Sequence, residues 1–266
     1  MKRVFIVGLC SAAIMTSITI LAGYIYTTDP YAVKDTPRWF VGLGGAIDSI
    51  FSTQDDSFLD TVQTVPGYSA GPSDLFGATS TSNVSGLLSV FAGRQWAISN
   101  GRLVQLFFEY DDVGRATANG QRLAFNIIYP GNLTNYSYDI SRRAFLLGAK
   151  VDLQNWGNHV MPYLEGGLGM SQNQFSNFMN NVNFNQMYPF PNHETNQFAC
   201  ELGAGLDWYA AKNWLFSAGY RFGYWGDVKS GNVLNSFPPG GALPAPIQLS
   251  QTLYSNQASF KMSYLF

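Results

Sequence analysis

The C-terminal stretch Gln257-Ala258-Ser259-Phe260-Lys261-Met262-Ser263-Tyr264-Leu265-Phe266 decides the fold, because its side chains alternate between two kinds. One set is apolar: Ala258, Phe260, Met262, Tyr264 and Phe266. The set between them is polar apart from Leu265. Successive side chains of a β-strand face opposite sides, so this period of two predicts a strand with one apolar face and one mostly polar face.

Seven segments upstream show the same period. Trp214–Tyr224 and Phe198–Tyr209 are as regular as the last stretch, whereas the facing is ambiguous near Leu87 and Leu88. The full set upstream is Trp39–Phe51, Val84–Ile98, Arg102–Val113, Tyr138–Leu153, Val160–Gln172, Phe198–Tyr209 and Trp214–Tyr224. The sequence therefore predicts eight strands.

The connections between these segments alternate in length. Three are short, at Ser99–Gly101, Gln154–His159 and Ala210–Asn213. Four are long and rich in Pro, Asn, Gln and Ser: Ser52–Asn83, Gly114–Ser137, Asn173–Glu194 and Trp225–Ser250. A compact soluble domain rarely carries four loops above ~20 residues, whereas short turns at one end and long loops at the other are typical of bacterial outer-membrane barrels.

The fold class that follows is all-β: an eight-stranded antiparallel up-and-down transmembrane β-barrel, with short periplasmic turns and four long extracellular loops. A sheet in hydrocarbon must close, because each unsatisfied backbone group there costs several kcal/mol. Apolar faces turned to lipid account for 12% charged and 15% aromatic residues without any long apolar run outside the N-terminus. The alternative architecture is a soluble β-sandwich or lipocalin-like barrel, with the apolar faces turned inward.

The first 23 residues read as a secretory signal peptide. Lys2 and Arg3 precede an apolar run from Val4 to Ile20, which is the order of a positive n-region and an h-region. An uncleaved anchor is the alternative. We expect residues 1–23 to be the signal, 24–38 a periplasmic tail and 39–266 the barrel, in the cell outer membrane.

Two kinds of motif carry a family resemblance. Phe260, Met262, Tyr264 and the terminal Phe266 resemble the signal read by the bacterial barrel-assembly machinery. Glycine-rich stretches such as Trp39–Gly45, Pro162–Gly169 and Gly203–Trp208 resemble the small eight-stranded barrels of the opacity-protein and OmpA-like superfamily. The resemblance covers about residues 39–266 and implies an outer-membrane surface protein whose fold needs no cofactor.

Aromatic residues gather beside the predicted short turns, as in an interfacial girdle. We expect the girdle to contain Trp39, Phe40, Trp96, Trp208, Tyr209 and Trp214.

Charged residues fall on the predicted inward faces. They are Glu109, Lys150, Asp152, Glu165, Glu201, Asp207, Arg221 and Lys261. Opposite charges in a narrow lumen should pair, because an isolated charge there loses its hydration. The main interpretation is a plug of ion pairs; the alternative is a narrow or gated pore for small solutes, although eight strands leave little room for one.

The predicted function is non-enzymatic: structural, adhesive or ligand-contacting work through the extracellular loops. The segment Asn173–Asn196 holds aromatics among many Asn, which suits either a contact loop or a loop that packs over the barrel mouth. A lipid-modifying enzyme is a weaker alternative, because His159 and His193 are the two histidines and no triad is visible. We predict no catalytic, metal or cofactor site.

The expected partners are outer-membrane lipid and lipopolysaccharide, the barrel-assembly machinery, and host-surface or envelope components. The net charge of −2 and the lack of a basic stripe argue against nucleic acid.

Overall fold

The computed structural model describes residues 37–53, 58–59, 74–77, 83–98, 102–125, 130–153, 159–180, 190–232 and 249–266. The signal peptide expected at 1–23 and nearly all of the tail expected at 24–38 lie outside these residues. Within the part described, no helix is long and apolar enough to cross a membrane.

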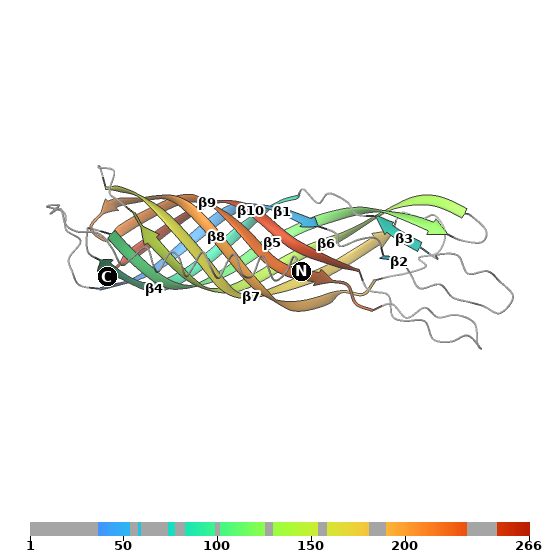
Figure 1. Cartoon of the computed structure of the whole chain (residues 1–266), viewed down its shortest axis with the longest axis horizontal. Coiled ribbons are helices and arrows are strands. Elements are labelled where there is room, and N and C mark those ends of the chain that lie inside the picture. Colours follow the sequence, from blue (N-terminus) through green and yellow to red (C-terminus); the bar gives the residue numbers. More distant parts are fainter. Residues whose placement is uncertain are drawn as a thin grey trace.

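Ten strands form one antiparallel sheet (Figure 1). They are β1 (Arg38–Thr53), β2 (Phe58–Leu59), β3 (Asp74–Gly77), β4 (Asn83–Ile98), β5 (Arg102–Phe125), β6 (Pro130–Asp152), β7 (Val160–Asn180), β8 (His193–Ala211), β9 (Trp214–Lys229) and β10 (Ser250–Leu265). Eight of them close in the ring order β1-β4-β5-β6-β7-β8-β9-β10, with β10 paired to β1 and β5 to β6. The short strands β2 and β3 add to the outer part of β5. The predicted eight-stranded antiparallel barrel is confirmed.

The two ends of the barrel differ. At one end, which we call the turn end, β8 reaches β9 through Lys212 and Asn213, and the backbone N–H of Phe266 donates to the carbonyl of Trp39 at 3.0 Å. At the other end, the loop end, β5 and β6 project as a long hairpin (Figure 1).

A band of apolar side chains covers the outside of the barrel near the turn end. On β5 the outward residues from Val104 to Tyr110 are apolar or aromatic, after Arg102 at the turn end, and Leu106 and Phe108 are 47% and 72% exposed. The next outward residue, Asp112, is charged, and it faces Arg143 on β6. On β6 the band begins at Phe145, which is 63% exposed. The band extends over the ~9–11 residues that a tilted strand needs to cross hydrocarbon, so its upper limit lies between Tyr110 and Asp112.

Three strands continue well beyond this band, which corrects the predicted loop boundaries. β5 has 24 residues, β6 has 23 and β7 has 21. Most of the segment Gly114–Ser137, expected to be a loop, is therefore strand, and only residues 126–129 between β5 and β6 lie outside the described part. Most of the described outward side chains on this extension are polar, for example Thr117 and Asn119, whereas Met179 is apolar and 66% exposed. The extension therefore has no apolar face by which the sequence could reveal it.

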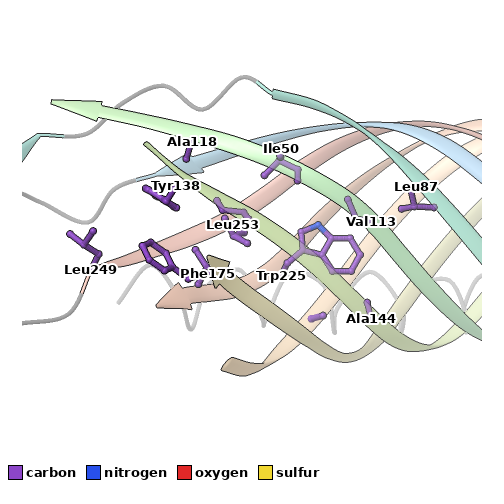
Figure 2. Packing of buried hydrophobic residues seen from close by; sticks show 14 of the residues in the cluster. Ile50, Leu87, Val113, Ala118, Tyr138, Ala144, Phe175, Trp225, Leu249 and Leu253 are labelled. Carbon is purple, nitrogen blue, oxygen red and sulfur yellow. The ribbon is translucent and has the colours of Figure 1, made fainter. Parts of the chain in front are cut away.

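The inside of the extension is mainly apolar (Figure 2), with Asn173 and Gln251 buried among the apolar side chains. The aromatic members pack in sequence: Tyr138 lies 4.6 Å from Phe175 between ring centroids, and Phe178 lies 4.9 Å from Phe190. Leu249, Leu253 and Ile50 belong to the same cluster, with Trp225 and others. This part of the molecule therefore has a water-facing exterior and a hydrophobic core, as a soluble protein does.

The aromatic girdle contains four of the six expected residues. The outward tryptophans are Trp39, Trp96, Trp208 and Trp214, and three of them are at least 40% exposed. Phe40 and Tyr209 were wrongly assigned to it. Phe40 is 2% exposed inside the barrel with Leu215 and Leu265, and Tyr209 packs against the same cluster. Each follows an outward tryptophan directly, so strand alternation turns it inward.

Candidate functional site: the charged barrel interior

The seven charged residues expected to share the lumen all point into the barrel, and none is more than 6% exposed. They are Glu109, Lys150, Glu165, Glu201, Asp207, Arg221 and Lys261. They come from β5, β6, β7, β8, β9 and β10, so closure of the barrel alone brings them together.

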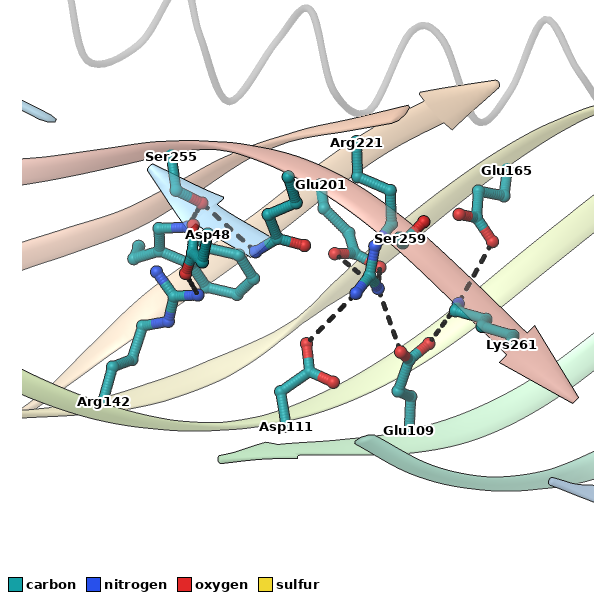
Figure 3. A network of polar contacts seen from close by, with 12 residues as sticks. Asp48, Glu109, Asp111, Arg142, Glu165, Glu201, Arg221, Ser255, Ser259 and Lys261 are labelled. Carbon is teal, nitrogen blue, oxygen red and sulfur yellow. Dashed lines mark hydrogen bonds and ion pairs between the residues drawn. The ribbon is translucent and has the colours of Figure 1, made fainter. Parts of the chain in front are cut away.

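Arg221 is the centre of the network (Figure 3). Its Nη1 donates to Glu109 Oε1 at 2.9 Å and to Glu201 Oε1 at 3.1 Å. Because β9 and β5 stand opposite each other in the eight-strand ring, the bond to Glu109 crosses the full width of the lumen.

Lys261 extends the network toward the turn end. Its Nζ donates to Glu109 Oε2 at 2.9 Å and to Glu165 Oε2 at 3.3 Å. The same ammonium lies over the rings of Phe91 and Phe107, at 5.4 and 5.3 Å from their centroids. The cation is thus held by carboxylates and by the aromatic layer beneath them.

A second group lies beside this one. Lys150 Nζ donates to Asp207 Oδ2 at 2.6 Å and lies 4.8 Å from the ring centroid of Tyr163. Tyr209 donates its hydroxyl proton to Asp152 Oδ2 at 3.0 Å. Asp152, also expected in the lumen, is fully buried.

Three charged lumen residues were missed: Asp48, Asp111 and Arg142. Arg142 Nη2 donates to Asp48 Oδ2 at 2.8 Å, and the Arg142 guanidinium lies 3.7 Å from the centroid of Trp225. Trp225 donates in turn to Ser255 Oγ at 2.8 Å. Strand alternation predicts these inward positions. Asp111 lies on the same face of its strand as Glu109, and Arg142 lies on the same face of its strand as Lys150.

Room for these long side chains comes from glycines on the inward faces. A Cβ at Gly203 would lie 2.8 Å from Arg221 Cγ, and one at Gly223 would lie 2.3 Å from the indole of Trp225. Trp225 itself precedes Gly226, whose φ of 70° belongs to a bulge opposite Leu253. Such a positive φ favours glycine, and the bulge re-aims the chain where the ionic and aromatic parts of the interior meet.

Acidic groups outnumber basic groups in this network. The carboxylates are Asp48, Glu109, Asp111, Asp152, Glu165, Glu201 and Asp207, and the cations are Arg142, Lys150, Arg221 and Lys261, so seven face four. Asp111 is the least satisfied: neither carboxylate oxygen has a hydrogen-bond partner, and its ion pair with Arg221 Nη2 is 3.9 Å long.

Free space inside the described part of the barrel is small where the ionic network meets the aromatic layer beneath it. A cavity of about 10 Å³ lies among Phe40, Phe91, Phe107 and Lys261, which suffices for about one water molecule. Ion pairs and apolar clusters of described residues lie on either side of it.

The remaining sequence candidates lie apart from this interior. Phe260 and Tyr264 are 56% and 40% exposed on the outside of β10, and Met262 shares that face. Phe266, directly after the end of β10, is 63% exposed. His159 is in the short turn before β7, as expected, whereas His193 begins β8 rather than lying in a loop. Among the described residues, no group of three or more His, Cys, Asp and Glu could hold a metal ion.

The fold and this interior define a class: the small eight-stranded antiparallel β-barrel of outer-membrane type. The chain is similar in structure to the outer membrane protein OprG from Pseudomonas aeruginosa, with a TM-score of 0.50 and 14% identity over 86% of this chain and 96% of that one. It is also similar to Neisserial surface protein A, with a TM-score of 0.42 and 14% identity over 86% and 97% of the two chains. No family model matches the sequence, and no curated protein does either.

Proposed function

We propose that this protein is a non-enzymatic surface protein of the bacterial outer membrane, which acts through its loop end. The single observation that carries the proposal is the contrast between a filled lumen and a long projecting sheet. The pair between Arg221 and Glu109 spans the lumen, and the interior above it is a packed aromatic core. Transport through such a barrel would require this network to open.

The projecting sheet of β5, β6 and β7 supports a role in contact. These strands run beyond the apolar band and present polar side chains to water, including Thr117, Asn119 and Gln174. The packed core beneath them keeps the sheet rigid, which favours binding without a large ordering cost. The partners proposed for this end are lipopolysaccharide, other envelope components or a host surface.

The exterior of β10 supports the proposed route of assembly. Phe260, Met262, Tyr264 and Phe266 form an apolar row on the strand that closes the barrel against β1. We propose that the barrel-assembly machinery reads this row, after export of the chain by its N-terminal signal.

A narrow cation-selective channel is the second candidate, favoured by the excess of buried carboxylates over cations. Protein reconstituted in planar bilayers decides between the two. We expect the wild-type protein to give no more conductance than a protein-free membrane, even at raised voltage. Discrete cation-selective steps would instead support the channel.

A binding experiment tests the positive part of the proposal. Intact cells that produce the protein should bind lipopolysaccharide-coated or host-cell surfaces more than cells without it. Binding should be lost when the sheet is altered by Thr117→Glu with Asn119→Glu, while the altered protein still shifts on unboiled gels as a folded barrel does. Equal binding by both cell types would contradict a contact role.

A further inference from the structure

Arg94 places a cation on the lipid-facing side of the barrel, near the turn end. Arg94 is on the outward face of β4, between Ala92 and Trp96 on its own strand. It is paired across the sheet with Trp39 on β1 and Leu106 on β5. Every one of these neighbours is apolar or aromatic, so the charge stands within the apolar band near the turn end.

The two tryptophans hold the guanidinium between them. Arg94 Cζ lies 5.3 Å from the ring centroid of Trp39 and 5.6 Å from that of Trp96. Both distances are within the ~6 Å range of cation–π attraction. The stacking fixes a long side chain that would otherwise be free to move.

Within the described ranges, the charge of Arg94 has no carboxylate to balance it. Its Nε atom is inaccessible to solvent and has no hydrogen-bond partner among the described residues. By contrast, Arg143 and Arg115, at the upper limit of the band, lie within 4.0 Å of Asp112 and Asp139. An anion from outside the chain can pair with this cation, because the two indoles place it at the edge of the apolar band, where lipid phosphates are found.

The geometry points to a binding site for the phosphate of an anionic phospholipid, made by Arg94, Trp39 and Trp96. A guanidinium presents several N–H donors in one plane and suits phosphate oxygens. The indoles offer their N–H groups at the level of the lipid headgroups, where tryptophan is enriched in membrane proteins. The site faces the leaflet at the turn end, which in the proposed orientation is the phospholipid leaflet on the periplasmic side. This inference rests on the proposed outer-membrane placement.

The test compares lipid retention by native mass spectrometry, after extraction from vesicles of equal parts phosphatidylglycerol and phosphatidylethanolamine. The wild type should retain one phosphatidylglycerol in preference to phosphatidylethanolamine. Arg94→Gln should lower this retention about tenfold, the loss expected for one charge-assisted interaction. The double change Trp39→Leu with Trp96→Leu keeps the charge and should lower retention about threefold.

The matched control is Arg143→Gln, which removes the same charge at the opposite limit of the band and should leave retention unchanged. Equal loss in both arginine variants, or retention without preference for the anionic lipid, would overturn the inference. Failure of the outer-membrane proposal looks different: the wild type itself would not insert into vesicles and would show no shift between unboiled and boiled gel samples. That shift also verifies that each variant is folded.

Discussion

The lower part of this barrel, near the turn end, and the upper part, near the loop end, have opposite patterns of apolar and polar side chains. Below the limit at Tyr110, residues such as Phe108 face outward and Glu109 faces inward. Above it, Asn119 faces outward, and Tyr138 and Phe175 face inward. The apolar side of a strand faces whichever surroundings exclude water, lipid in the first case and the protein's own core in the second.

A single strand carries both patterns because a bulge separates them. In β5 the residues Gly114 and Arg115 stand opposite Ser141 alone, so Val113 and Ala116 both point inward. The bulge lies just above the change from Tyr110 to Asp112. The inside of the barrel can thus change from ionic to aromatic, while the hydrogen-bonded wall remains continuous.

The largest expected effect is on the ionic part. Arg221→Met removes the cation that serves Glu109 and Glu201 and leaves buried carboxylates together, so we expect a loss of about 3–5 kcal/mol in the free energy of unfolding. Urea titration of the barrel in lipid vesicles measures it. Arg143→Met is the control: its pair with Asp112 is 4.0 Å long and more than half exposed, and should contribute less than about 1 kcal/mol. If the two changes cost the same, the network does not stabilise the barrel as described.

The next effect tests the limit between the two parts. Phe108→Arg places a charge on the apolar band and should cost about 2–4 kcal/mol in a bilayer. Asn119→Arg makes a similar change on the outward face of the same strand above the limit, and should stay within about 0.5 kcal/mol. Unfolding in vesicles, followed by tryptophan fluorescence, measures both. A negligible cost at Phe108 would mean that water, not lipid, surrounds the lower barrel.

Sequence alone predicted the lower barrel well and the upper part poorly. The period of two held over Leu202–Tyr209 of β8, Trp214–Gly223 of β9 and Gln257–Leu265 of β10, the parts of these strands near the turn end. In β5 the bulge at Gly114–Arg115 changes which residues face inward, so the period breaks where the strand continues. Polar outward residues then resemble those of a loop, and Gly114–Ser137 was read as one.

The interior was predictable in kind but not in full. Alternation placed Glu109, Arg221 and Lys261 in the lumen, but which atoms pair depends on strand stagger around the ring, which a sequence does not give. The cation–π contact of Arg142 with Trp225 depends on the bulge at Gly226. No sequence pattern distinguishes that glycine from the others that make room inside the barrel.

A smaller effect is expected where the ionic network is least balanced. Asp111→Asn removes one negative charge from an interior with seven carboxylates and four cations. Since its oxygens accept no hydrogen bond, the change should be neutral or stabilising by about 1 kcal/mol. Glu109→Gln serves as the comparison, because Glu109 accepts bonds from both Arg221 and Lys261 and its loss should destabilise. Urea titration ranks the two variants, and a larger loss from Asp111→Asn would contradict this account of the charge balance.

The last effect appears only in alkali and is absent at neutral pH; it concerns the aromatic part, above the membrane band. Burial raises the pKa of Tyr136 from 10.0 to about 12, so the folded state holds this proton more tightly than the unfolded chain. The stabilising contribution is complete below pH 10 and is lost as the pH rises toward 12. Alkaline titration should therefore increase hydrogen exchange in the upper strands before the lower barrel responds. Tyr136→Phe should remove this part of the pH dependence, because the phenyl ring keeps the packing against Phe178 without a titrating group. If the alkaline transition is unchanged in that variant, groups other than Tyr136 cause the transition.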